Sequence, residues 1–367
     1  MDSFADILVI GAGIAGASAA DALAASARVI VLEQEERAGL HSTGRSAALF
    51  SETYGNEVIR ALSRASRAFL ADPPEGFCET ALIRPRGSLY VAAEDQLDRL
   101  SALEISAGTF ERLSGAEARV RVPILRPEAS AAALYEPGAM DIDVDALHQG
   151  FLRRLRKRGG QLVADAPVAG LSREAADWVA TTPKGEFRAP IVINAAGAWA
   201  DRVATIAGLS PLGLQPKRRT AALIDGPDLD FAGWPMVIDV AETVYFKPDA
   251  GRLLISPADE TDTEPCDAQP DDLDIAIAAD RIERMTTLGI RRIAHRWAGL
   301  RTFAPDRTPV CGYDPRAEGF FWLAGQGGYG IQTSVALAAL AARLVLRAPG
   351  DLAELEAPLA PGRYARN

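Results

Sequence analysis

The chain has few cysteines, few histidines and no long apolar run. Its 367 residues include 3 cysteines and 3 histidines. Cys78, Cys266 and Cys311 are too few and too scattered for a disulfide framework or a cysteine-rich metal site, so we expect a reducing, cytoplasmic compartment and no metal. No apolar segment is long enough to span a bilayer. Asp2 and Asp6 stand where a signal peptide would carry basic residues, which argues against a secretory leader.

An excess of basic residues is also missing. The formal net charge is -10 at pH 7 and the sequence pI is about 5.0. This charge disfavours nucleic acid and anionic membranes as partners, because phosphate groups are normally bound by clustered Lys and Arg. The remaining composition is ordinary for a globular enzyme, and the length predicts two domains.

The most informative segment is residues 5–33. A short apolar run, 7–10, predicts a buried strand, and Gly11, Gly13 and Gly16 follow it directly. In this pattern the first glycine permits a tight turn, the second lets a pyrophosphate approach the backbone, and the third lets a helix pack closely on the sheet. Glu33, at the end of a second strand, is placed to bind a ribose hydroxyl. The segment therefore predicts a dinucleotide site, with Ile14, Ala15 and Gln34 beside it.

Further periodic segments indicate strands and helices in an interleaved order. We expect helices at 57–70, 94–105, 273–288 and at the C-terminus after residue 330, and a helix capped by Asp143 that ends at Gly159. We expect strands at 87–92, 161–164, 178–182, 191–194 and 320–324, and a strand-rich block over 220–256.

Two more glycine turns decide between cofactors. Residues 194–199 (NAAGAW) and 325–330 (GQGGYG) each follow a predicted buried strand. A nicotinamide site needs one such turn, whereas the long FAD molecule uses several. The sequence therefore favours FAD.

At this point the chain resembles the FAD-dependent D-amino-acid oxidase and glycine oxidase superfamily, and most closely its bacterial D-arginine dehydrogenase group. The resemblance covers nearly the whole length and is carried by six segments in the correct order, at 41–48 (HSTGRSAA), 194–199, 217–219 (KRR), 245–248 (YFKP), 297–301 (WAGLR) and 325–334.

The resemblance implies an α/β fold of the glutathione-reductase-like, D-amino-acid oxidase type. A Rossmann-type FAD-binding domain would comprise residues 1–82, 134–214 and 296–367. An interleaved substrate domain on an antiparallel or mixed sheet would comprise residues 83–133 and 215–295.

The resemblance also assigns cofactor contacts. A loop beside the pyrophosphate and the flavin ring would be formed by His41, Ser42, Thr43, Arg45, Ser46, Ala47 and Ala48. Val168 would contact adenine through its backbone, and Ala196, Gly197 and Trp199 would approach the cofactor at the second turn. The third turn and its helix N-terminus would face the pyrimidine side of the flavin through Gly327, Gly328, Tyr329, Gly330, Ile331 and Gln332, where the helix dipole stabilises negative charge.

For the substrate, the resemblance assigns Arg301 to the α-carboxylate, which a guanidinium can bind through two parallel N–H donors. Arg219 would be a second contact, although on a strand either Arg218 or Arg219 must point away. Tyr54 and Tyr245 would flank the substrate, and the Gly330 carbonyl would face its amine.

No histidine base is evident from the sequence. His148 shares a helix face with apolar residues and is expected to be a packed side chain. His295 has no recognisable partner, and His41 is the histidine that we associate with the cofactor.

Three positions depart from the D-arginine dehydrogenase pattern or from its relatives. Ser88 and Leu49 stand where those enzymes carry a glutamate and a histidine, which removes a countercharge for a cationic side chain. Phe50 is expected to extend an apolar wall. Gly299 stands where sarcosine oxidases carry the cysteine that bonds the flavin, so we expect FAD to be held without a covalent link.

The sequence therefore predicts oxidative deamination of a D-amino acid with a small or apolar side chain, by hydride transfer to flavin N5. The alternatives are a 2-hydroxy-acid or secondary-amino-acid dehydrogenase or oxidase, a non-catalytic FAD-binding subunit and, against the charge, a module acting on tRNA bases. The electron acceptor is left open between oxygen, a quinone and an electron carrier.

Overall fold

The computed structural model describes residues 3–107 and 109–364. Its first sheet is parallel except at one edge and runs in the order β20-β21-β13-β1-β2-β9. The strands are β20 (Val310–Tyr313), β21 (Phe320–Ala324), β13 (Ile191–Asn194), β1 (Ile7–Ile10), β2 (Val29–Leu32) and β9 (Gln161–Val163). β1, β2 and β21 are buried at every position, as expected for short apolar strands covered on both faces.

Helices rich in small residues cover this sheet. α1 (Ile14–Leu23) packs against α8 (Gly330–Leu346) and α5 (Val144–Lys157), and α8 also packs against α2 (Glu57–Ala71). A side chain at Gly16 would place its Cβ 1.8 Å from the Gly11 carbonyl oxygen, so α1 lies as close to the turn as glycine allows. α6 (Ala200–Ile206) and the antiparallel sheet β10 (Gly170–Glu174), β11 (Asp177–Thr182) and β12 (Gly185–Ala189) complete this half, and the short helix α9 (Glu356–Leu359) packs on β20.

A larger, mostly antiparallel sheet forms the other half and follows the order β18-β14-β17-β16-β15-β5-β7-β6, with β19 pairing β14. Its strands are β18 (Thr261–Asp262), β14 (Gln215–Ile224), β17 (Arg252–Ser256), β16 (Tyr245–Asp249), β15 (Met236–Asp239), β5 (Ser88–Ala92), β7 (Ala132–Glu136), β6 (Glu111–Ser114) and β19 (Ile293–Phe303). The helices of this half are α3 (Leu97–Ala107), α4 (Gly115–Arg121) and α7 (Asp272–Met285). The strands β3 (Leu49–Phe50), β8 (Met140–Ile142) and β4 (Ile83–Pro85) form a separate small sheet in the order β3-β8-β4.

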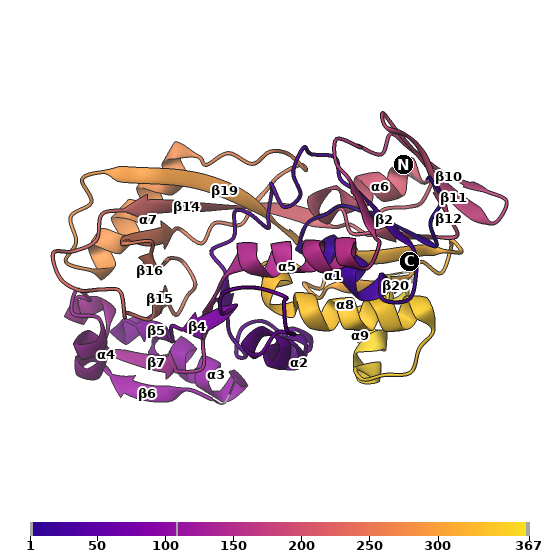
Figure 1. Cartoon of the computed structure of the whole chain (residues 1–367). Coiled ribbons are helices and arrows are strands. Elements are labelled where there is room, and N and C mark those ends of the chain that lie inside the picture. Colours follow the sequence, from indigo (N-terminus) through magenta and orange to yellow (C-terminus); the bar gives the residue numbers. More distant parts are fainter. Residues whose placement is uncertain (1–2, 108, 365–367) are drawn as a thin grey trace.

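The longest strand pair is the one that positions the site. β14 and β19 run side by side along the upper edge of the molecule in Figure 1, from the end that carries α7 toward the helices α1 and α8. Their antiparallel register pairs Lys217 with Arg301 and Arg219 with Gly299. Directly opposed residues point to the same face, so Arg219 and Arg301 are diagonal neighbours on one face of this pair.

The fold class predicted from the resemblance is observed, and most predicted elements lie within a few residues of their expected bounds. Asp143 caps α5, since its Oδ1 accepts from the Ala146 amide at 2.9 Å. The sequence pattern did not predict β19 as a strand. The domain division remains a prediction, and its boundary at 295/296 falls inside this strand.

Candidate active site

A cavity of about 390 Å³ extends from the β1–α1 turn to the β14–β19 pair. Its size is within the range of pockets that hold small ligands and cofactors. At one end it is lined by Glu33 and Val168, and at the other by Tyr54, Tyr245 and Arg301.

The first glycine turn is bare backbone on the cavity side. Gly11 has φ +99°, and a Cβ there would lie 2.6 Å from the Ala195 carbonyl oxygen. Glu33 accepts from the Ala12 amide at 2.7 Å and from the Glu35 amide at 3.0 Å. Burial raises the pKa of the Glu33 carboxyl, and these amides oppose that effect. The N-cap residue of α1 is Gly13, which has no side chain to cap the helix, and a helix N-terminus of this kind favours an anion such as a pyrophosphate.

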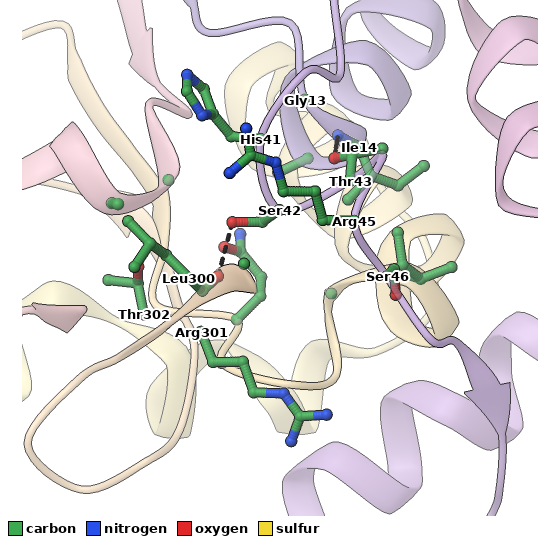
Figure 2. A pocket seen from close by; sticks show the side chains of 18 of the residues that line it. Gly13, Ile14, His41, Ser42, Thr43, Arg45, Ser46, Leu300, Arg301 and Thr302 are labelled. Carbon is green, nitrogen blue, oxygen red and sulfur yellow. Dashed lines mark hydrogen bonds between the residues drawn. The ribbon is translucent and has the colours of Figure 1, made fainter. Parts of the chain in front are cut away.

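The loop 41–48 joins the two ends of the cavity. Thr43 Oγ1 accepts from the Ile14 amide at 3.0 Å, and Ser42 Oγ donates to the Leu300 carbonyl at 2.6 Å (Figure 2). The loop is thereby bound both to α1 and to the residue that precedes Arg301.

His41 lies at the start of this loop and lines the cavity. Its Nε2 lies 2.8 Å from Glu35 Oε1, and its ring packs on Trp199 with centroids 4.7 Å apart. Its Nδ1 is buried without a partner among the described residues. A polar ligand in the cavity could satisfy that nitrogen.

Arg45 lines the cavity, but its guanidinium does not remain free there. It donates to the carbonyls of Ala268 and Ala298 at 2.8 and 3.1 Å, and it forms an ion pair with Asp267. In this conformation Arg45 binds the segment between β18 and α7. Its guanidinium is therefore not free for the expected contact with phosphate or flavin oxygens.

The third glycine turn brings the N-terminus of α8 to the cavity. Gly327 has φ +55°, and a Cβ there would lie 2.2 Å from the Phe303 ring. A Cβ at Gly328 would lie 2.9 Å from Arg301 Nη1, so this glycine leaves space for the guanidinium. The helix has no side-chain cap at Tyr329, which leaves its first amides available to an acceptor.

Arg301 is the central cation of the substrate end. It is partly buried at the cavity wall, and its Nη1 contacts the Tyr54 hydroxyl at 3.5 Å. Burial would lower the pKa of Arg301, but Tyr54 and Tyr245 outweigh that effect, so the group stays charged. Among residues 3–107 and 109–364 no carboxylate pairs with it. An anionic ligand would supply the missing partner.

Arg219 lines the same end of the cavity, whereas Arg218 does not. Arg218 pairs instead with Asp274 at 2.7 Å, behind β14. Burial acts to raise the pKa of the Tyr245 hydroxyl, yet the charges of Arg301 and Arg219 are stronger and lower it overall. Tyr245 is therefore a better hydrogen-bond donor than an ordinary phenol.

Most predicted contact residues line this one cavity. These are Gly11, Gly13, Ile14, Ala15, Glu33, Gln34, His41, Ser42, Thr43, Arg45, Ser46, Ala47, Ala48, Leu49, Tyr54, Val168, Ala196, Gly197, Trp199, Arg219, Tyr245, Arg301, Gly327, Gly328, Gly330, Ile331 and Gln332.

Four others lie outside the lining. Gly16 is beneath the turn, where it sets helix packing. Phe50 is fully buried in an apolar core cluster and forms no wall of the cavity. Ser88 is also buried, and its hydroxyl donates to Glu136 at 3.1 Å. Tyr329 packs behind the site against Tyr54, with ring centroids 4.8 Å apart.

Several lining residues were missed by sequence reasoning. Tyr90, Met236 and Ile238 form an apolar wall from β5 and β15, and Glu242 lines the cavity from the β15–β16 turn. Glu242 is solvent-exposed, so Leu49 and Ser88 do not remove every carboxylate from this region. The sequence offered one signal for Glu242, because it lies only three residues before Tyr245, which was already assigned to the substrate end.

His148 is packed, as expected, but it also makes a specific polar contact. Its Nε2 lies 2.8 Å from the Ala12 carbonyl oxygen, in the first glycine turn. Burial lowers the pKa of His148, although this contact opposes the effect. The residue therefore supports the turn from behind.

Two classes of feature are not found in the described part of the chain. No group of His, Cys, Asp and Glu side chains is arranged to hold a metal ion. No helix within it combines the length and the apolar character needed to cross a membrane.

The relatives of the chain are oxidoreductases. Glycine oxidase of Geobacillus kaustophilus is 24% identical and the match covers 93% of each chain. Human mitochondrial sarcosine dehydrogenase is 26% identical over 88% of this chain, which spans 37% of that longer protein.

Solved structures share the fold over the whole length. L-proline dehydrogenase from P. horikoshii superposes with a TM-score of 0.87 at 22% identity, covering 100% of this chain and 99% of the other. The glycine oxidase of Geobacillus kaustophilus gives 0.86, with 99% of each chain covered.

The family model named DAO, FAD dependent oxidoreductase, matches residues 6–344. The glycine turns, the two helix N-termini and the unpartnered His41 nitrogen form a site that fits FAD. The chain therefore belongs to the DAO family of FAD-dependent oxidoreductases.

Proposed function

We propose that this protein oxidises an amino acid at its CH–NH₂ group, and that its substrates are D-amino acids with small or apolar side chains. The observation that carries the proposal is Arg301, a partly buried guanidinium that lines the cavity and has no carboxylate partner among the described residues. Such a group binds an α-carboxylate with little competition from the protein.

The neighbouring side chains support this assignment. Tyr54 and Tyr245 place phenol groups beside Arg301, where they can donate to a carboxylate and exclude water. Met236 and Ile238 offer an apolar surface to the side chain. When bound, FAD supplies the two-electron acceptor for the hydride that leaves the α-carbon. The residual imine is hydrolysed by water to a 2-oxo acid and ammonia.

The residues of the chain bind and orient the substrate in this proposal, and no side chain is assigned as an obligatory base. The amine would enter uncharged, so that its lone pair forms the C=N bond as the hydride leaves. The Gly330 carbonyl would accept from that amine.

The decisive experiment is anaerobic reduction of the holoenzyme. Purified protein would be mixed with D- and L-amino acids, secondary amino acids and 2-hydroxy acids, and flavin absorbance would be followed. We expect bleaching by small and apolar D-amino acids with release of ammonia. D-lysine and D-arginine belong in the panel because Glu242 lines the cavity, and strong preference for them would restore the narrower likeness to D-arginine dehydrogenase.

A second candidate is oxidation of a secondary amino acid. The names of two relatives favour it, since sarcosine and L-proline are secondary amino acids and a sarcosine dehydrogenase and an L-proline dehydrogenase are among the matches. Release of a primary amine or a cyclic imine in place of ammonia would identify this activity. Reduction by 2-hydroxy acids alone would instead indicate the alcohol-oxidising alternative, and no reduction by any compound would indicate a non-catalytic FAD-binding subunit.

A further inference from the structure

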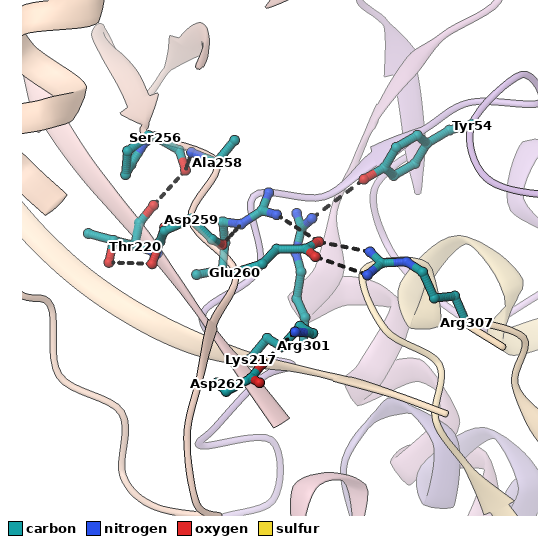
Figure 3. Close-up of polar contacts among 12 residues, drawn as sticks. Tyr54, Lys217, Thr220, Ser256, Ala258, Asp259, Glu260, Asp262, Arg301 and Arg307 are labelled. Carbon is teal, nitrogen blue, oxygen red and sulfur yellow. Dashed lines mark hydrogen bonds and ion pairs between the residues drawn. The ribbon is translucent and has the colours of Figure 1, made fainter. Parts of the chain in front are cut away.

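Glu260 connects two arginine side chains beside the substrate end of the cavity. Its Oε1 accepts from Arg307 Nη2 at 2.9 Å and its Oε2 from Arg307 Nη1 at 3.0 Å (Figure 3). Its Oε1 also accepts from Arg219 Nη2 at 3.3 Å. The pairing with Arg307 is bidentate, which is the strong geometry for a guanidinium and a carboxylate.

Arg219 is held in place by the same segment. Its Nε donates to the Asp259 carbonyl at 2.7 Å, and the Asp259 carboxylate accepts from the Thr220 amide at 2.7 Å. The segment that follows β17 is therefore fastened to β14 at Arg219 and Thr220. This arrangement directs Arg219 toward Glu260 while the residue still lines the cavity.

The two arginines on this face of the β14–β19 pair are thus not equivalent. Arg219 has a carboxylate partner, whereas Arg301 contacts only the Tyr54 hydroxyl within ion-pair or hydrogen-bond distance in the described residues. Arg307 is about half exposed, and its charge is also balanced by Glu260. One guanidinium is left for a ligand, and the other two are occupied by the protein.

We propose that Glu260 is a specificity-determining residue that restricts this site to monocarboxylate substrates. The inference rests on the proposed function, in which Arg301 binds the α-carboxylate. A second carboxylate on the substrate would need Arg219, and it would have to displace Glu260 from that cation. The displaced carboxylate would then repel the incoming one, so dicarboxylic amino acids and hydroxy acids are rejected.

The test is Glu260→Gln in the FAD-loaded protein, with the dissociation constants of unreactive acids measured through changes in flavin absorbance. Propionate is the monocarboxylate probe, and succinate and glutarate are the dicarboxylate probes. We expect the parent to bind the dicarboxylates no better than propionate. The variant should shift the ratio of dissociation constants in favour of a dicarboxylate by roughly tenfold or more, since a charge-assisted hydrogen bond becomes available.

Matched variants separate this effect from a general disturbance. Asp262→Asn removes the carboxylate of the neighbouring Asp262–Lys217 pair and should leave the ratio unchanged. Combining Glu260→Gln with Arg219→Gln should return the ratio to that of the parent. Flavin content and the thermal unfolding temperature verify that each variant is folded.

The outcomes distinguish this proposal from the proposed reaction. An unchanged ratio in Glu260→Gln, or a gain that persists without Arg219, would overturn the role of Glu260. Carboxylate binding with the expected ratio, but no oxidation of any amino acid, would overturn the reaction and leave the role of Glu260 intact. Failure of the parent to bind any carboxylate would overturn both.

Discussion

Arg301 and Tyr54 meet across the substrate end of the cavity, with 3.5 Å between Nη1 and the phenol oxygen. The two residues come from segments 247 positions apart in the chain, and the guanidinium is partly buried at the cavity wall. Space for it exists because residue 328 is glycine. The cation is thus positioned before any ligand arrives, which reduces the ordering cost of binding.

Replacing Arg301 with Met should abolish carboxylate anchoring. Hydrogen bonds to charged groups contribute about 1.5–3 kcal/mol each, so losing a two-point contact should lower kcat/KM by ~100-fold or more. Stopped-flow reduction of the flavin by substrate would measure this decrease in kcat/KM. Arg284→Met, at an exposed pair with Asp280, is the control and should behave as the parent does. Equal kcat/KM in Arg301→Met and the control would refute the assignment.

Gly16→Ala should damage the cofactor site even though residue 16 does not line the cavity. The added Cβ would lie 1.8 Å from the Gly11 carbonyl oxygen, so α1 must move away from the turn. Overpacking of this kind costs about 1–3 kcal/mol of the free energy of unfolding, and we expect weaker FAD binding in addition. Denaturant unfolding and FAD titration measure the two effects. Gly233→Ala, where a Cβ meets nothing within 4 Å, should leave both unchanged.

His148 should make stability depend on pH. Burial lowers its pKa in the folded chain, so below the unfolded value of about 6.5 the unfolded chain binds more protons. The free energy of unfolding therefore falls as pH drops through that value, and this contribution is absent at higher pH. Urea unfolding at pH 7 and pH 5 would measure this decrease in the free energy of unfolding.

In that experiment His148→Gln keeps an N–H donor for the Ala12 carbonyl but cannot titrate, so its pH dependence should be smaller. The exposed His295 provides the control variant His295→Gln. Identical slopes for all three proteins would show that His148 does not contribute.

Bound FAD should leave the protein on acid precipitation. The position at which sarcosine oxidases carry their flavin-bonding cysteine is Gly299 here, and a Cβ at this residue would lie 3.4 Å from Arg45 Cβ. The expected result is a yellow supernatant and a colourless pellet. Flavin fluorescence that stays with the denatured chain on a gel would contradict it.

The sequence predicted the parts of the site that depend on short-range pattern. Gly11, Gly13 and Gly16 follow an apolar strand directly, and their spacing alone indicates the turn and the close helix. Loop 41–48 and Arg301 were assigned through family likeness, and both line the cavity. The D-amino-acid specificity remains a proposal because no single motif encodes the shape of the side-chain pocket.

Long-range pairing explains what the sequence could not predict. β19 contains His295, Arg296, Gly299 and Arg301, so it lacks the apolar alternation of a half-buried strand, and its partner β14 stabilises it instead. The orientation of Arg219 over Arg218 follows from the same pairing. Glu260 reaches Arg219 only after the chain has passed through β15, β16 and β17, a placement that no local spacing reports.

The pairing of β14 with β19 also constrains how this protein can change over evolutionary time. Because Arg219 and Arg301 are held on one face by the strand register, deleting or inserting a single residue within either strand would turn one of them to the opposite side. Point substitutions can retune the pocket gradually, whereas length changes here would remove an anchor in one step. Natural variation in chain length should therefore gather in the connecting turns and spare these two strands.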